Sequence, residues 1–65
     1  RQLFPQLSAE EQRVVDALRA NNDLQINLLT VKTALPVPTL TATLFSLEMK
    51  GVVRSLAGGI YHLIN

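Results

Sequence analysis

The stretch 37–51 constrains the fold more than any other part of the chain, because it carries an apolar face and both ends of one helix. Three leucines share the helical spacing of four and then three residues: Leu40, Leu44 and Leu47. Pro38 suits a first helical position, where its missing N–H costs no hydrogen bond. Gly51 suits the left-handed residue that ends a helix, and Lys50 places a cation near the negative end of the helix dipole. The stretch therefore predicts a helix of about three turns.

An earlier helix is indicated by a capping box. Ser8 is followed three residues later by Glu11, so the hydroxyl and the carboxylate each reach a backbone N–H at the helix start. We expect this helix to run from about Ala9 to Ala20. Glu10 and Glu11 also lie at the favourable end of the helix dipole. An active-site pair of carboxylates is the alternative for these two residues, but capping and the dipole explain both.

A short second helix is expected before the one at 37–51. Asn27 is a plausible N-cap for a helix of roughly Leu28 to Ala34. Pro36 and Pro38 then each push the preceding residue out of the α region, so the helix stops and a tight turn follows. Two helices joined this closely form a helix-turn-helix.

The C-terminal part of the chain predicts a β-hairpin. Two β-prone runs, 52–56 and 60–64, flank Gly58 and Gly59, which both tolerate the positive φ of a type I′ turn. This turn would place Leu56 opposite Tyr61, whose ring would contact Leu56, and Arg54 opposite Leu63. Pairing with a short strand at 24–26 would make three strands. The predicted fold is α+β: a winged helix-turn-helix with three helices and a small antiparallel sheet.

Composition limits the chain to one small domain of 65 residues. Residues 1–7 read as a linker and residues 8–65 as the winged-helix domain, which we expect to be part of a longer protein. No cysteine is present, which fits a cytoplasmic protein. No apolar run approaches the roughly 18 residues of a membrane span. Hydrophobic residues make up 48% and charged residues 17%, which indicates that some apolar side chains face another surface.

No constellation of catalytic, metal or cofactor residues appears in the sequence. His62 is the only histidine and the chain lacks cysteine, so the usual zinc ligand sets are missing. We therefore predict a protein that is not an enzyme and needs no cofactor.

The side of the third helix opposite its leucines decides between two kinds of partner. On this outward side we expect Ala42, Phe45, Ser46 and Met49, flanked by Thr39, Thr41 and Lys50. A recognition helix reads bases with Arg, Lys, Asn or Gln, yet no cation occurs between Pro38 and Met49. Weak contact with the DNA backbone is the alternative reading, and its candidate residues are Lys32, Thr39, Thr41, Lys50 and Arg54.

The favoured reading is a protein-docking surface. Its candidate residues are large and apolar, and lie on the second and third helices: Leu28, Val31, Phe45 and Met49. Burying a Phe, Leu or Met is worth about 1.5–3 kcal/mol, so such side chains would either belong to the core or meet a partner. The sequence leaves both possibilities open for Phe45 and Met49.

Several short motifs together resemble one family. They are Leu7-Ser8-Ala9-Glu10-Glu11-Gln12, Ile26-Asn27 with Leu29, Thr33-Ala34-Leu35-Pro36-Val37, Leu47-Glu48-Met49-Lys50-Gly51-Val52-Val53, and Leu56-Ala57-Gly58-Gly59 with Tyr61. This pattern resembles the C-terminal winged-helix domain of the bacterial DNA-processing protein A family (DprA, also called Smf).

The resemblance implies a role in natural transformation and recombination. Proteins of this kind handle incoming single-stranded DNA and load the RecA recombinase onto it, mainly through a Rossmann-like domain that precedes the winged helix. It further implies that this chain is an accessory module. Its expected partners are that preceding domain or a second copy, and through the full-length protein single-stranded DNA and RecA, with no membrane involved.

Overall fold

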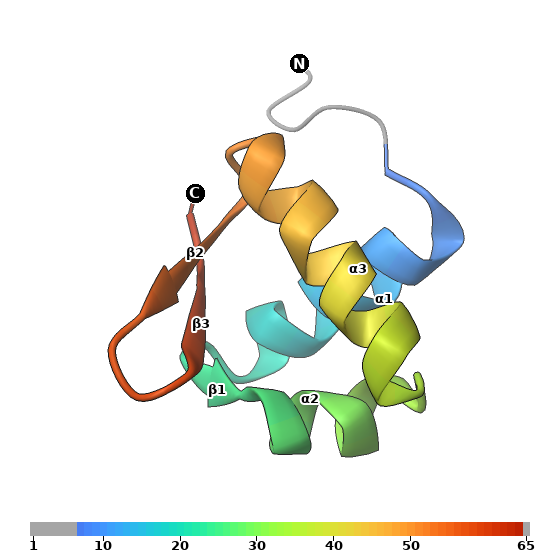
Figure 1. Cartoon of the computed structure of the whole chain (residues 1–65), viewed down its shortest axis with the longest axis horizontal. Coiled ribbons are helices and arrows are strands. Elements are labelled where there is room, and N and C mark those ends of the chain that lie inside the picture. The colour runs from blue at the N-terminus through green and yellow to red at the C-terminus, as the bar shows by residue number, and fades with distance from the viewer. Residues whose placement is uncertain (1–6, 65) are drawn as a thin grey trace.

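The computed structural model describes residues 7–64, which form three helices and one three-stranded sheet (Figure 1). In chain order the elements are α1 (Ala9–Ala20), β1 (Leu24–Gln25), α2 (Ile26–Thr33), α3 (Val37–Met49), β2 (Val53–Leu56) and β3 (Ile60–Leu63). This order confirms the predicted α+β winged helix. Residues 1–6, which belong to the predicted linker, and Asn65 lie outside the described residues.

Helix α1 starts where the capping box predicts and ends at Ala20, as expected. The backbone N–H of Glu11 donates to Ser8 Oγ at 3.2 Å, and the N–H of Ser8 donates to Glu11 Oε1 at 2.8 Å. Both bonds satisfy backbone groups that a helix start leaves without an internal partner. Local sequence therefore determines this end of α1.

Helix α2 begins two residues earlier than predicted, and its N-cap is Gln25 rather than Asn27. The Asn27 side chain accepts from the backbone N–H of Leu28 at 3.0 Å, inside the first turn. The helix ends at Ala34, which adopts the left-handed conformation at φ 59°. Pairing of the preceding residues 24–25 with β3 leaves Ile26 as the first residue free to enter the helix.

The turn between α2 and α3 bends the chain by 106°, as in a helix-turn-helix. Pro36 is the N-cap of α3, and Pro38 lies in its first turn, where no N–H is needed. At the other end, the N–H of Gly51 donates to the Glu48 carbonyl and that of Val52 to the Leu47 carbonyl, both at 3.0 Å. With Gly51 at φ 78°, this is a Schellman motif, so the predicted glycine stop is confirmed.

The sheet has the order β1-β3-β2, and both pairs are antiparallel. The predicted hairpin register is wrong by one residue: Leu56 pairs with Ile60, and Arg54 pairs with His62. Ala57 joins Gly58 and Gly59 in a three-residue loop, so β2 ends one residue earlier than it would with a two-residue turn. Tyr61 consequently lies opposite Ser55, not Leu56, and pairs with Leu24 on its other side.

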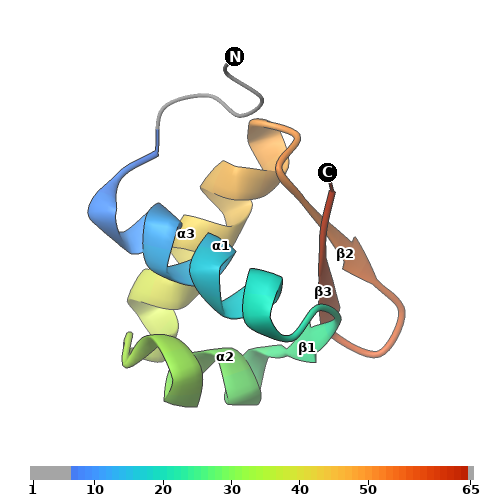
Figure 2. The same cartoon turned by 180° about the vertical axis from the view of Figure 1, so that it is seen from behind.

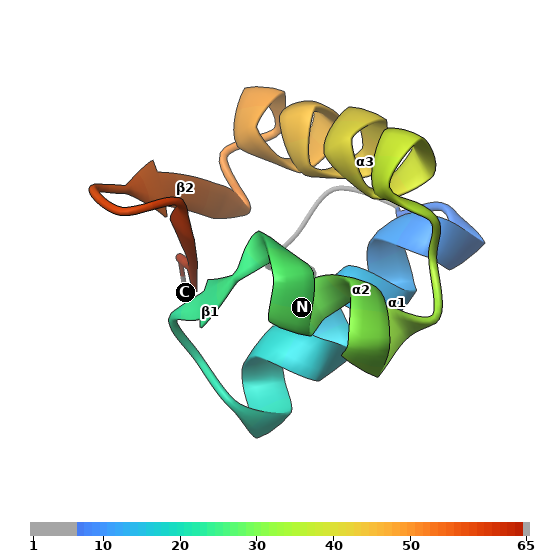
Figure 3. The same cartoon turned by 60° about the horizontal axis from the view of Figure 1, so that its bottom comes forward.

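The core lies between the three helices and the sheet, whose arrangement Figure 2 shows from behind. Its buried apolar side chains come from every helix and strand and from the connecting segments: Val14, Val15, Leu18, Leu24, Leu29, Leu35, Leu40, Leu44, Leu47, Val52, Val53 and Leu63. Figure 3 shows α3 along one edge of the described fold, with α1 and α2 on its inner side. The opposite side of α3 is therefore left without a covering element among residues 7–64.

Candidate functional site

The two sides of α3 differ sharply in burial. Leu40, Leu44 and Leu47 are at most 1% exposed, as their spacing predicts. Phe45 is 63% exposed and Met49 is 74% exposed, although they alternate with the buried leucines along the same helix. The question that the sequence leaves open is thereby answered for this chain: Phe45 and Met49 are outside its core.

The exposed apolar side of α3 forms a narrow stripe. Pro38, Ala42, Phe45 and Met49 follow one another at spacings of four, three and four residues, and all four are exposed. At 100° per residue they fall within a sector of about 60° on the helix. We call these four residues the outer seam. It carries no charge and no side-chain hydrogen-bonding group.

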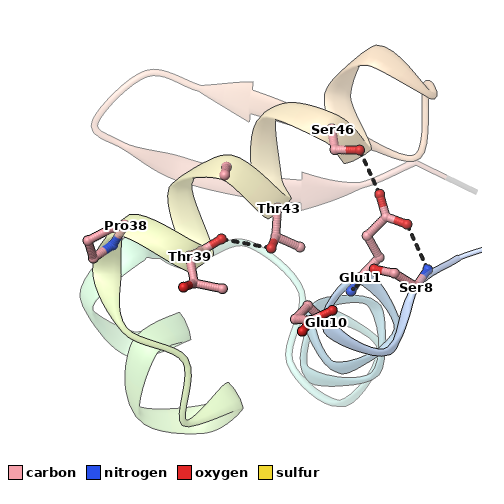
Figure 4. Close-up of a pocket in the computed structure, with 8 residues that line it drawn as sticks. Ser8, Glu10, Glu11, Pro38, Thr39, Thr43 and Ser46 are labelled. Carbon is pink, nitrogen blue, oxygen red and sulfur yellow. Dashed lines mark hydrogen bonds between the residues drawn. The ribbon is translucent and has the colours of Figure 1, made fainter.

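Ser46 does not lie where the sequence predicts. The Ser46 hydroxyl donates to Glu11 Oε2 at 2.7 Å, and the Lys50 ammonium donates to Glu11 Oε1 at 2.7 Å. This flank of α3 therefore faces the start of α1, as Figure 4 shows for Ser46 and Glu11. The prediction that Ser46 points outward is wrong, because α1 crosses α3 on that flank.

Glu11 makes two contacts that the capping box does not predict, with Ser46 and Lys50 of the third helix and its C-cap. It is 4% exposed, yet it accepts hydrogen bonds from Ser8, Ser46 and Lys50. Burial by itself would raise the pKa of this carboxyl. The hydrogen bonds from Lys50, the Ser8 backbone and Ser46, with the Lys50 charge, outweigh burial and lower the pKa from 4.5 to about 2. Glu11 is therefore a buried carboxylate that joins the first turn of α1 to the end of α3.

A groove lies beside Glu11, between the first turn of α1 and the first half of α3 (Figure 4). It measures about 480 Å³, and its walls combine polar side chains with two members of the outer seam. The lining residues are Ser8, Glu10, Glu11, Pro38, Thr39, Ala42, Thr43 and Ser46. The small side chains of the seam thus border a hollow, whereas Phe45 and Met49 do not line it.

The candidate DNA contacts are spread over three elements. Lys32 on α2 lines a different groove, together with Arg13 and Asp16 of α1. Arg54 is on β2, paired across the sheet with His62, and Lys50 is bound to Glu11. Thr39 and Thr41 are exposed on α3 and bring no charge. The structure does not gather these five residues into one cationic patch.

Leu28 and Val31 of α2 are also exposed, at 45% and 77%. They belong to α2, whereas Phe45 and Met49 belong to the second half of α3, which starts near the end of α2 and runs away from it (Figure 1). Eight residues separate Val37 from Phe45, which is about 12 Å along the helix axis. The four predicted docking residues therefore form two faces, one on α2 and one on α3.

His62 has a carboxylate neighbour that the sequence does not indicate. Its Nδ1 lies 2.6 Å from Asp23 Oδ1, and the adjacent Asn22 side chain accepts from the N–H of Leu63 at 2.9 Å. These contacts tie the turn after α1 to β3. Within residues 7–64 no group of three His, Cys, Asp or Glu side chains is placed to hold a metal ion.

None of the three helices in the described part of the chain is by itself long and apolar enough to cross a membrane. The bent pair α2 and α3 reaches that length and hydropathy only when both helices are taken together.

Comparison with known proteins identifies a family for this chain. No curated protein and no solved structure matches the chain significantly. The family model described as the DprA winged helix domain matches residues 2–59, which is most of the chain. Such domains are non-catalytic modules, and the match supports a DprA-like role in DNA processing. This chain belongs to the DprA winged helix domain family.

Proposed function

We propose that this domain is an accessory module of a DprA-like DNA-processing protein and acts mainly by docking on protein through the outer seam of α3. One observation carries the proposal. The side of α3 that a DNA-binding winged helix would present to the major groove carries exposed Phe45 and Met49 and no cation.

The exposed area of these two side chains favours a protein partner. Burying an exposed Phe or Met side chain against a partner is worth about 1.5–3 kcal/mol. The seam carries no charge, so an apolar partner surface would bury no charge without a counter-charge. Aromatic residues and methionine are also enriched at the centres of protein interfaces. DNA phosphates, by contrast, would gain nothing from the seam.

Weak backbone contact with DNA remains the second candidate, and the exposed side chains of Lys32 and Arg54 favour it. Each cation that neutralises a phosphate releases a counterion, so affinity grows with the number of such contacts. Lys50 contributes less than its position suggests, because Glu11 holds its ammonium at 2.7 Å. Two or three dispersed cations give little affinity at physiological salt.

The proposed setting is a longer cytoplasmic protein of the DprA type that works in natural transformation and recombination. In it, a Rossmann-like domain preceding the winged helix would handle single-stranded DNA and load RecA. The winged helix would dock on that domain or on a second copy. Family membership supports this setting.

Oxidation of Met49 tests docking directly, because the residue is the only methionine of the 65-residue chain and belongs to the seam. The full-length protein and the dilute isolated domain would be treated with peroxide, and sulfoxide at Met49 followed by mass spectrometry. Docking predicts slower oxidation in the full-length protein. Equal rates in the two samples would contradict the proposal, because the seam would then be uncovered in both.

Nuclear magnetic resonance separates docking from the DNA alternative. The domain would be titrated with short single-stranded and duplex DNA at low salt. Docking predicts at most small, unsaturated shifts at Lys32 and Arg54 and none at Phe45 or Met49. Saturable shifts along α3 that persist at physiological salt would establish DNA as the partner of this face instead.

A further inference from the structure

We propose that the partner of the outer seam is a second copy of this chain, with the two α3 helices packed antiparallel about a twofold axis. The inference rests on the proposed docking role of this face and adds the identity of the occupant. It comes from the order of large and small side chains along the seam, and from the groove beside the small ones.

The seam has the spacing of a helix–helix contact. Pro38, Ala42, Phe45 and Met49 alternate by four and three residues, which is the spacing of the a and d positions in a coiled coil. Its two small members occupy the first half of α3 and its two large members occupy the second half. Two helices with this order are therefore complementary when they run in opposite directions.

An antiparallel pair places large side chains against small ones. When Phe45 of one helix meets Ala42 of the other, the same register brings Met49 to Pro38, and twofold symmetry repeats both contacts. A parallel pair would instead set Phe45 against Phe45 and Ala42 against Ala42. Layers of two large or two small side chains fill space less evenly, so the antiparallel arrangement packs better.

The surface of the chain is hollowed beside the places that this register assigns to the large side chains, on the flank of α3 that faces α1. Pro38 and Ala42 both line the groove of about 480 Å³ between α1 and α3 (Figure 4). Phe45 and Met49 of the second copy would stand over these two residues, at the rim of the groove. The groove thus adjoins the outer seam at its two small residues, while the two large residues lie outside the groove.

Electrostatics agree with the antiparallel direction. Opposed helix dipoles bring each C-terminal end beside the N-terminal end of the other helix. Glu48 would then lie beside the first turn of the second α3, where a negative charge is favourable. The two copies of Glu48 would be nine residues apart along the helix axis, which is about 13 Å, and would repel each other little.

The described fold leaves room for this partner, since no other element lies over the outer side of α3 (Figure 3). One helix of 13 residues from each copy makes a contact below the roughly 1,200 Å² of a standard interface. The isolated domain should therefore associate weakly and reversibly. In a full-length protein the seam would add to whatever other contacts hold two copies together.

Dilution of the isolated chain provides the first test, with the ¹³C-labelled methyl group of Met49 as the reporter. We expect its signal to shift between micromolar and millimolar protein and the sedimentation mass to rise in parallel. Phe45→Asp should weaken association about tenfold or more. Val31→Asp, which adds the same charge at an exposed valine of α2, should change it little. Both sites are exposed, so both variants should keep the amide spectrum of a folded domain.

A swap of large and small residues tests the register. Phe45→Ala removes the large side chain, and Ala42→Phe fills the space opposite it in the second copy. Each single variant should therefore weaken association. The double variant Phe45→Ala/Ala42→Phe restores large-against-small pairing in reverse and should recover association to within a few-fold. Failure of the double variant to recover association would overturn the pairing of Phe45 with Ala42. Single variants that leave association unchanged would place the contact elsewhere and would overturn the proposed dimer.

Failure of this inference is distinguishable from failure of the docking role. If the isolated chain stays monomeric at millimolar concentration while Met49 is protected in the full-length protein, the seam docks on another protein surface and the self-pairing is wrong. If Met49 is unprotected in the full-length protein and the chain is monomeric, both proposals fall.

Discussion

Glu11 shows how much one residue contributes in this small domain. Its carboxylate completes the capping box of α1 and also binds Ser46 and Lys50 near the other end of the chain. A buried carboxylate without such partners would be costly, because its charge is removed from water. Three donors offset that cost, so the group stays ionised at neutral pH.

The first prediction is that Glu11 makes folding sensitive to acid. Its pKa is lowered from 4.5 to about 2 in the folded chain, so its contribution is complete above pH 4.5 and is lost as the pH falls towards 2. At 1.36 kcal/mol per pH unit, the loss is up to about 3 kcal/mol. Urea unfolding followed by circular dichroism across this range should show a steeper fall in stability for the wild type than for Glu11→Gln.

The matched control is Glu10→Gln, which removes a carboxylate from the neighbouring, exposed position without touching Lys50 or Ser46. It should keep the wild-type dependence on pH. Identical profiles for the wild type and Glu11→Gln would show that the carboxylate is not stabilised by its partners.

At the level of the elements, α3 carries two functions on one helix. Leu44 belongs to the core and is 1% exposed, whereas the next residue, Phe45, is 63% exposed. Stability should therefore depend on one of these neighbours and binding on the other. One side of α3 thus serves stability and the other serves binding, over the same stretch of the helix.

The second prediction follows from this contrast. Leu44→Ala should lower the free energy of unfolding by about 2–5 kcal/mol, because it leaves a cavity. Phe45→Ala should lower it by less than about 1 kcal/mol at protein concentrations where the chain is monomeric. Thermal and urea unfolding measure both values. A loss at Phe45 as large as that at Leu44 would mean that Phe45 supports the fold, and the docking face would lose its centre.

The third prediction concerns the two helix ends that use the left-handed conformation. Gly51 ends α3 at φ 78°, whereas Ala34 ends α2 at φ 59° without the freedom of a glycine. Gly51→Ala should destabilise the chain and Ala34→Gly should stabilise it, each by about 0.5–1 kcal/mol. No atom lies within 4 Å of a methyl group added at Gly51, so the effect there is conformational rather than steric. Changes of the same sign in the two variants would contradict this reasoning.

At the scale of the whole molecule, charge is sparse and dispersed. The net charge is +1, and the described cations lie on α1 and α2, at the C-cap of α3 and on β2. An arrangement of this kind releases few counterions on contact with DNA. Any binding of the isolated domain should therefore depend weakly on sequence and moderately on salt.

The fourth prediction concerns the salt dependence of DNA binding by the isolated domain. The slope of log affinity against log salt should be no steeper than about −3 for duplex DNA, because three candidate cations contribute about −0.9 each. Arg54→Ala and Lys32→Ala should each reduce the slope by at most about one. Fluorescence anisotropy at several salt concentrations measures it. A slope much steeper than this would reveal a cationic surface that the described residues do not form.

Features that depend on neighbours a few residues apart follow directly from the sequence. The capping box of Ser8 and Glu11, the glycine stop at Gly51 and the stripe of Leu40, Leu44 and Leu47 all act within one or two helical turns. They specify where α1 and α3 lie and which side of α3 enters the core. Together with the Gly58–Gly59 turn, these local features predict the winged helix.

The features that join distant segments depend on the tertiary structure. Glu11 binds Ser46 across 35 positions of sequence and Lys50 across 39, and its bond to Ser46 holds that side chain against α1 instead of on the outward side. The hairpin register depended on whether Ala57 joined the loop. Exposure of Phe45 depended on which side of α3 the other elements left uncovered. Helical and strand periods specify directions along one element, whereas contacts between elements depend on how all of them pack together.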